Sequence, residues 1–203
     1  MIFIDYQNLY NDARRAFHVP ADPMVCGQID PMRLGRLLTS RQPLGTTGER
    51  VLEEVRVYRG RPDSTKEPKT YGAHMRQCAA WEAAGVTVRH RPLRYPHGWP
   101  NKRPEEKGID VQIAVDVIAM AMNDEFDIAV IASTDTDLKP PLEAFPDLPV
   151  GAAKQIEVAA WKSAVFKKAL RIEGQHIWCH FIENDEYRQL RDNRDYNVRR
   201  RSN

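Results

Sequence analysis

The sequence predicts an α/β domain of three layers, in which helices cover both faces of a mostly parallel sheet. Two observations support this fold class. Short apolar runs that are typical of strands alternate along the chain with stretches of helical spacing. In addition, the run FDIAVIAS (126–133) contains a continuous apolar stretch, as in a strand that is buried on both faces of a sheet.

Strands and helices are expected to alternate from the start of the chain. Asp30 and Pro31 are typical of the N-cap and first position of a helix, and Gly85 lies where a helix C-terminal cap belongs. The expected elements of the first half are a strand at 2–5, a helix from about residue 9, a helix starting within 29–38, a strand at 51–58, a helix over 71–79 and a strand at 86–93.

The second half begins with a proline-rich loop without periodicity, RYPHGWPNKRPEEKG (94–108). The alternation then continues. The expected elements are a helix over 110–122, the strand within 126–133, a helix from about 141, a strand at 155–161, a helix at 165–170, a strand at 176–182 and a helical piece over 184–193. We expect one domain over residues 1–188 and a basic, flexible tail over 189–203.

The composition is that of an ordinary soluble protein. The chain has 203 residues, of which 42% are hydrophobic and 29% charged. No apolar run approaches the ~20 residues that span a bilayer, and the N-terminus lacks the pattern of a signal peptide. We therefore expect a cytoplasmic protein without a membrane partner. The sequence leaves its oligomeric state open between monomer and homodimer.

The cysteines indicate no disulfide framework and no zinc site. Cys26, Cys78 and Cys179 are odd in number and widely spaced, and no CxxC occurs. His176, Cys179 and His180 lie close in sequence. On a strand, however, Cys179 and His180 point to opposite faces, so packing is the expected role of these residues.

Four aspartates from three segments are expected at one edge of the sheet. Asp5 ends the first strand, Asp135 and Asp137 follow the buried strand, and Asp110 begins a helix at the same edge. In such sheets ligands bind at the carboxyl ends of the strands. Clustered carboxylates repel one another unless a cation is bound, and oxygen-only ligands favour Mg²⁺ or Mn²⁺. A capping role would explain Asp135 or Asp110 singly, but not Asp5.

Three blocks of sequence resemble the signatures of NYN domains, which are PIN-like nucleases of the LabA and DUF88 type. The blocks are FIDYQNLY (3–10), KGIDVQIAVDVIAMA (107–121) and IASTDTDLKPPLEAF (131–145). The later strands also fit that family, so the resemblance extends over nearly the whole chain. It implies a PIN-like, Rossmann-like fold and a Mg²⁺- or Mn²⁺-dependent ribonuclease that hydrolyses RNA phosphodiester bonds.

The resemblance implies roles for individual residues. Asp5, Asp110, Asp135 and Asp137 would form the catalytic metal centre. Asn8 would lie beside the metal or the scissile phosphate, and Lys107 would contact the phosphate. Asp116 lies six residues after Asp110, so it faces the site one turn down or pairs with a basic residue.

Two residues depart from the family pattern. Tyr6 stands where the first block commonly has glycine, and we expect it to narrow the site or stack on a base. Thr134 replaces the glycine of the third block and can donate a hydroxyl to the substrate. Neither departure removes a carboxylate, so activity is still expected.

Charge is distributed unevenly along the chain. Residues 89–104 hold five cationic side chains and no acid, whereas residues 108–147 hold nine acids and one lysine. The basic loop carries Arg94 and Trp99 and leads into the metal-binding segment, which suits single-stranded or structured RNA through phosphate neutralisation and base stacking. Alternatively, its aromatic residues pack back on the domain. For the whole chain, the alternative to a nuclease is a nucleic-acid-binding regulatory module with little or no catalysis.

Overall fold

The computed structural model of the chain describes residues 1–198 and contains a six-stranded sheet in which all pairings are parallel. The strand order is β3-β2-β1-β4-β5-β6. The strands are β1 (Ile2–Asp5), β2 (Val55–Arg61), β3 (Thr87–Pro92), β4 (Ile128–Ala132), β5 (Gln155–Trp161) and β6 (Cys179–Ile182). The predicted α/β class with a parallel central sheet is therefore confirmed.

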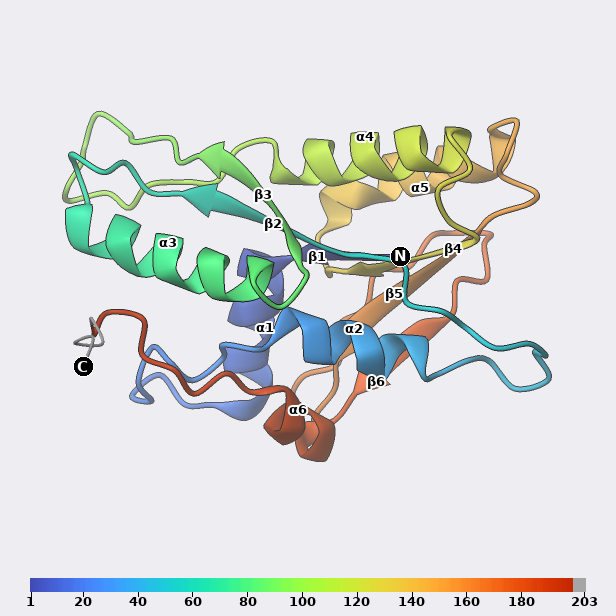
Figure 1. Ribbon diagram of the computed structural model, residues 1–203, viewed down its shortest axis with the longest axis horizontal. Coiled ribbons are helices and arrows are strands. Elements are labelled where there is room, and N and C mark those ends of the chain that lie inside the picture. The colour runs from blue at the N-terminus through green and yellow to red at the C-terminus, as the bar shows by residue number, and fades with distance from the viewer. Residues whose placement is uncertain (199–203) are drawn as a thin grey trace.

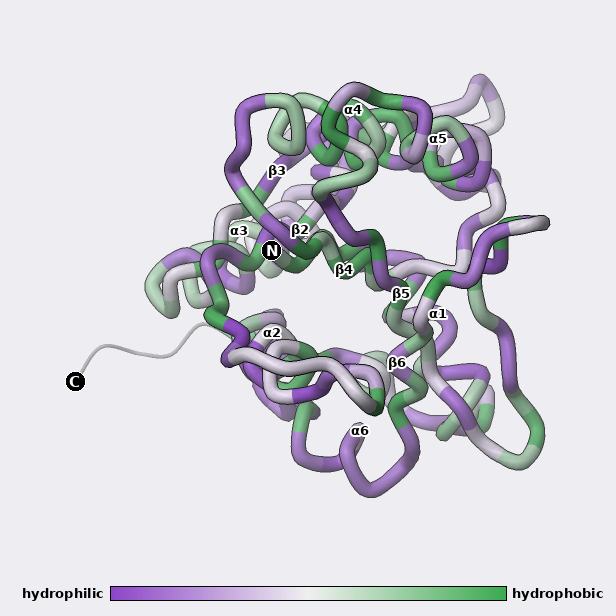
Figure 2. Tube along the Cα trace, turned by 90° about the vertical axis from the view of Figure 1, so that its right-hand side faces the viewer, coloured by the Kyte–Doolittle hydropathy of each residue, from purple (hydrophilic) through white to green (hydrophobic). Residues whose placement is uncertain are grey.

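Helices cover both faces of this sheet, as Figure 1 shows. Helices α4 (Ile109–Met122) and α5 (Lys139–Ala144) lie on one face. The other face is covered by α1 (Tyr6–Phe17), α2 (Pro31–Thr39), α3 (Pro68–Glu82) and α6 (Asn184–Leu190). Viewed along the sheet, the apolar strands form the middle of the three layers (Figure 2).

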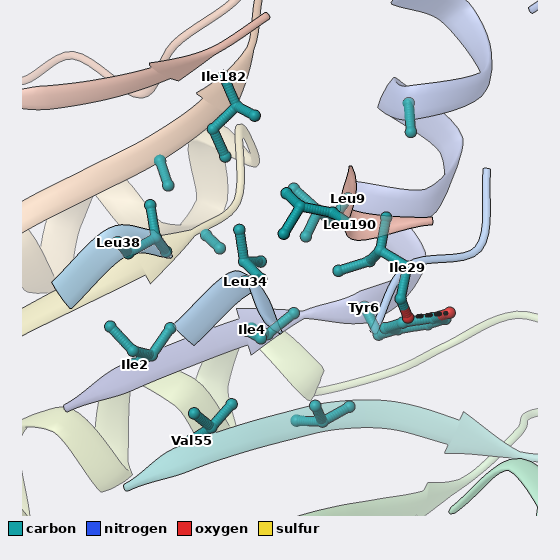
Figure 3. Close-up of a cluster of buried hydrophobic side chains, with 14 of the residues drawn as sticks. Ile2, Ile4, Tyr6, Leu9, Ile29, Leu34, Leu38, Val55, Ile182 and Leu190 are labelled. Carbon is teal, nitrogen blue, oxygen red and sulfur yellow. Dashed lines mark hydrogen bonds between the residues drawn. The ribbon is translucent and has the colours of Figure 1, made fainter. Parts of the chain in front are cut away.

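The alternation of side chains along β1 divides the core into two clusters. Phe3 packs with Ile113 and Val117 of α4, whereas Ile2 and Ile4 point to the opposite face. Figure 3 shows Ile2 and Ile4 in that second cluster, beside side chains from α1, α2 and the end of α6. Because both faces are covered, the central strands must be apolar on both sides, as the sequence indicated.

Several predicted elements differ in the structure. Helix α1 begins at Tyr6 rather than near residue 9, and β6 begins at Cys179 rather than at residue 176. Strand β2 begins at Val55 rather than at residue 51, because its neighbour β1 begins only at Ile2, which is level with Val55. Residues 165–170 form no helix. The Ser163 hydroxyl accepts the backbone N–H groups of residues 165 and 166 and holds a turn there. Leu170 is nevertheless buried in the core, so its apolar character reflects packing rather than helical periodicity.

The segment after α6 lies against the domain as far as the structure describes it. The backbone of Arg191 forms an antiparallel β-bridge with that of Ile29. The buried Asp192 accepts hydrogen bonds from Arg194 and Tyr196. The last three arginines of the predicted basic tail lie outside the described residues. Within residues 1–198, no helix has the length and apolar character needed to cross a membrane.

The strand order identifies the edge of the sheet at which ligands bind in folds of this kind. Chain connections leave β1 toward β2 on one side, while β4 lies on its other side, so the order reverses between β1 and β4. Ligands in parallel α/β sheets bind at the carboxyl ends of the strands at such a switch point. Asp5 is the last residue of β1, and Ser133 directly follows β4.

Candidate active site

Asp5 is a buried carboxylate at the switch point. Its relative exposure is 5%, and among residues 1–198 it accepts two hydrogen bonds, from the Asn8 backbone N–H at 3.2 Å and from the Ser133 hydroxyl at 3.2 Å. Desolvation, opposed in part by these bonds, raises the pKa of Asp5 from 3.8 to about 7. Asp5 also caps the N-terminus of α1 through the Asn8 N–H, so the expectation that a capping role does not explain Asp5 is wrong.

Asp135 lies next to Asp5 at the end of β4. Its backbone N–H donates to the Ser133 hydroxyl oxygen at 3.1 Å, so Ser133 connects Asp135 to Asp5. The charge of Asp135 contributes to the raised pKa of Asp5. Asp135 also accepts the backbone N–H of Asp137 at 3.0 Å, and the exposed side chain of Asp137 stands in the following 3-10 turn.

Glu106 is a further carboxylate of the site that sequence reasoning missed. Its negative charge raises the pKa of Asp5 more than that of Asp135 does, and burial raises its own pKa. Glu106 accepts the backbone N–H of Gly60 in β2. A Cβ atom at position 60 would lie 2.2 Å from the Leu93 Cδ2 and 2.8 Å from the Glu106 Cγ, so glycine leaves room for both side chains. The available signal was an acid directly before the KGID motif.

Asp110 lies at the same edge as Asp5 and Asp135, but it takes no part in the hydrogen bonds that connect those two residues. It stands in the first turn of α4, and α4 contacts the 3-10 turn over Thr136–Leu138. The N-cap of α4 is Gly108, in the left-handed conformation with φ 71°, so Asp110 does not serve as the cap. Among residues 1–198 no hydrogen bond occupies its half-buried carboxylate, which leaves the carboxylate available for a ligand.

A second layer of polar contacts holds the loop after β4. Asn8 Oδ1 accepts the Thr134 backbone N–H at 2.9 Å, and the Thr134 hydroxyl donates to the buried Asp12. Thr134 is itself buried, with a relative exposure of 2%. Its hydroxyl is thus turned into the protein, and the expectation that it donates to the substrate is wrong. Asn8 Oδ1 thus holds the loop, and the expected position of Asn8 beside a metal or phosphate stays a prediction.

Tyr6 does not face the site. It is 3% exposed, its ring lies 4.5 Å from that of Trp81, and the Arg59 guanidinium covers it at 5.0 Å. Its hydroxyl donates to the Ile29 carbonyl, as drawn in Figure 3. The expectation that Tyr6 narrows the site or stacks on a base is therefore wrong, because β1 leads directly into α1 and turns this ring into the core.

Asp116 belongs to a separate polar cluster. It accepts hydrogen bonds from the Tyr58 hydroxyl at 2.8 Å and from Gln112 at 2.7 Å, and Arg56 lies 3.5 Å away. Of the two roles that the sequence allowed, pairing with a basic residue is the one observed. The placement of Asp116 in the site is wrong.

The basic loop over residues 94–108 follows the carboxyl end of β3 and leads into α4, and its Glu106 contacts Gly60 of β2. Tyr95 packs back on the domain, since its hydroxyl donates to Glu67 at 2.6 Å, and Trp99 packs edge-on against Tyr95 at 5.0 Å. The exposed Arg94 and Lys107 side chains remain on the surface. Lys107 lies 3.9 Å from Glu105, a pairing between exposed groups that is worth little.

The donor set fits a hard divalent cation. Asp5, Asp135, Asp137, Asp110 and Glu106 offer only carboxylate oxygens, as Mg²⁺ and Mn²⁺ prefer. A cation would offset the burial, and the smaller repulsion by neighbouring carboxylates, that together raise the pKa of Asp5. In the described part of the chain, however, no three of these carboxylates have oxygens within 4.8 Å of one another. Binding would therefore need side-chain rotation, which the exposed Asp137 and half-buried Asp135 permit.

Comparison with known proteins gave a family match. The sequence model of the NYN domain matches residues 1–150, a range that contains every carboxylate of the candidate site. No curated protein matches the chain. Among solved structures, a protein of unknown function from Vibrio parahaemolyticus RIMD 2210633 matches with 18% identity over 78% of each chain and a TM-score of 0.49.

Proposed function

We propose that this chain, which belongs to the NYN domain family, is a Mg²⁺- or Mn²⁺-dependent ribonuclease that hydrolyses RNA phosphodiester bonds. NYN domains are PIN-like and of the nuclease type. The catalytic activity, the metal and the substrate are proposals for this chain. They are supported by its own carboxylates as well as by its family.

The position of Asp5 carries the proposal. A buried carboxyl at the strand-order switch point, flanked by Glu106 and Asp135, destabilises the metal-free protein at neutral pH. A buried charge that destabilises the free protein is typical of a functional site, because a bound ligand then stabilises that charge. Asp5 also caps α1, but this cap offsets the cost of the buried charge only in part, and no ion pair to Asp5 exists among residues 1–198.

The residues of the site have distinct tasks in this proposal. Asp5, Asp135, Asp137 and Asp110 would hold the cation, and Glu106 is a further candidate ligand. A bound Mg²⁺ or Mn²⁺ supplies activation of a water molecule and stabilisation of charge on a phosphoryl oxygen.

The polar contacts around the carboxylates orient them. Ser133 connects Asp5 to the backbone of Asp135, and Asn8 together with Asp12 fixes Thr134 between them. These bonds hold the start of the loop that carries Asp135. Preorganised positions are the usual requirement for stabilising charge that develops during a reaction.

RNA would approach along the basic loop. Lys107 and Arg94 are exposed cations near the carboxylates and would contact phosphates. Trp99 is half-exposed, so one side of its ring is accessible for stacking on a base, whereas Tyr95 is engaged with Glu67. Single-stranded RNA is the substrate class that this combination fits best.

The test is cleavage of a labelled single-stranded RNA with Mn²⁺, Mg²⁺ or EDTA. Asp135→Asn should abolish metal-dependent cleavage. Asp127→Asn is the matched control, because Asp127 immediately precedes the same strand and is exposed at its opposite end. RNA that is bound but not cleaved with either metal would contradict the nuclease and indicate the binding module.

A further inference from the structure

A second group of metal-ligating side chains lies away from the carboxylates. His74 and Cys78 stand one turn apart on α3, and His90 projects from the edge strand β3. Their ligand atoms all lie within 4.8 Å of one another. His74 Nε2 is 3.2 Å from His90 Nδ1 and 3.6 Å from Cys78 Sγ.

These distances match those between ligands of a tetrahedral zinc ion. With Zn–N of about 2.05 Å and Zn–S of about 2.3 Å, tetrahedral angles put two nitrogens about 3.3 Å apart and a nitrogen and sulfur about 3.6 Å apart. Helical i, i+4 spacing of His74 and Cys78 supplies two ligands from one face of α3. The side chains therefore need little movement to close on an ion.

The burial of this cluster is typical of metal ligands rather than of side chains exposed to solvent. His74 is 3% exposed and Cys78 is 1% exposed, and the His74 Nδ1 has no hydrogen-bond partner among the described residues. Desolvation, followed by the charge of Arg59, lowers the pKa of His74 to about 3, and desolvation also lowers that of His90. Both rings are therefore neutral near pH 7, with lone pairs available. Burial raises the pKa of Cys78 to about 11, so the thiol would lose its proton only as a metal ion binds.

We propose that His74, Cys78 and His90 form a structural Zn²⁺ site that fastens α3 to β3. One thiolate and two imidazoles are the ligands that select Zn²⁺ over Mg²⁺ or Mn²⁺. A water molecule, or Glu82 one turn after Cys78 on α3, would complete the coordination. Glu82 would also offset the positive charge that the ion adds beside Arg59.

The site would stabilise the strand that leads into the basic loop. His90 pairs with Arg59 in the β2–β3 ladder, and the chain passes from β3 to Leu93 and the loop within three residues. A tie between α3 and this edge strand would hold the start of the loop in place. This role is independent of the carboxylates and of any nuclease activity.

The test uses the chelator-treated full chain titrated with Co²⁺, which reports zinc-type sites by absorption. We expect a single equivalent to give the visible bands of tetrahedral Co²⁺ and a near-ultraviolet thiolate charge-transfer band, both displaced by Zn²⁺. The Zn²⁺ dissociation constant should be below about 1 µM. Zn²⁺ should also raise the melting temperature.

Two pairs of variants make the assignment specific. Cys78→Ser should remove the charge-transfer band, whereas Cys179→Ser, a half-buried cysteine elsewhere, should keep it. His90→Gln should weaken Zn²⁺ binding at least tenfold, whereas His97→Gln in the exposed loop should not. A native protein without the band, or a band that survives in Cys78→Ser, would overturn the proposal.

Discussion

Replacing Asp5 by asparagine should stabilise the metal-free protein above pH 7. Asparagine has nearly the same shape, and its amide oxygen can still accept the Asn8 N–H that caps α1. The amide nitrogen can donate to the Ser133 oxygen in place of the present bond. The substitution therefore removes a charge that burial disfavours, while it keeps the local contacts.

The magnitude follows from the pKa of Asp5. The folded protein raises it from 3.8 to about 7, so the folded state binds more protons than the unfolded state between these values. Stability then falls as pH rises through this window and is constant above it. At 1.36 kcal/mol per pKa unit the full loss is about 4 kcal/mol, of which about 2.5 kcal/mol falls between pH 5 and pH 8.

The assay is urea denaturation in EDTA at several pH values, for the native protein and for Asp5→Asn. The difference between the two stability curves isolates Asp5 from the other titrating groups. This difference should grow in favour of the variant from pH 5 to pH 8. Mn²⁺ at pH 8 should stabilise the native protein and have a much smaller effect on the variant.

Parallel pH profiles for the two proteins would refute this reasoning. They would mean that water or another group solvates the Asp5 carboxylate in the folded state. A variant that is less stable than the native protein at pH 8 would likewise show that the Asp5 charge contributes to folding, as in an ordinary helix cap.

Three further predictions concern the surroundings of the site. Thr134→Val should lower the free energy of unfolding by about 1.5–3 kcal/mol in urea denaturation, because it leaves the buried Asp12 without a hydrogen bond from the hydroxyl. Gly60→Ala should reduce metal-dependent RNA cleavage at least tenfold with the fold retained by circular dichroism, because the new methyl group displaces both Leu93 and Glu106. Lys107→Ala should weaken RNA binding without sequence preference and lower the slope of log affinity against log salt by about 0.7, as measured by fluorescence anisotropy.

The fold and the central pair of carboxylates were predictable from sequence. Alternating apolar runs indicated a parallel sheet. The continuous apolar run before Ser133 indicated a strand that is buried on both faces, and this strand lies in the centre of the sheet. The strand ends then brought Asp5 and Asp135 to one edge, as the structure shows. Local patterns sufficed here because strand direction and sheet edge follow from topology.

The side chains that sequence reasoning misplaced depend on distant partners. Tyr6 turns away from the site to pack on Trp81, which is 75 positions later in the chain. Asp116, on helix α4, accepts a hydrogen bond from Tyr58 of strand β2. Glu106 reaches the site because Gly60 on β2 leaves room for it. No periodicity within a single segment reports such contacts.

The histidine and cysteine cluster shows the same limit. The sequence lacks a CxxC motif, and we expected no zinc site from it. His90 comes twelve residues after Cys78 and on a different element, so spacing alone does not relate them. Only the packing of α3 against β3 brings the three side chains together.

The most direct test of the central claim is the rate of RNA cleavage by native protein and by Asp5→Asn in Mn²⁺, with RNA affinity measured on the same samples. If Asp5 is the buried member of a catalytic metal centre, cleavage should fall by about a hundredfold or more while the dissociation constant for RNA changes little. Equal cleavage rates for the two proteins would contradict the account.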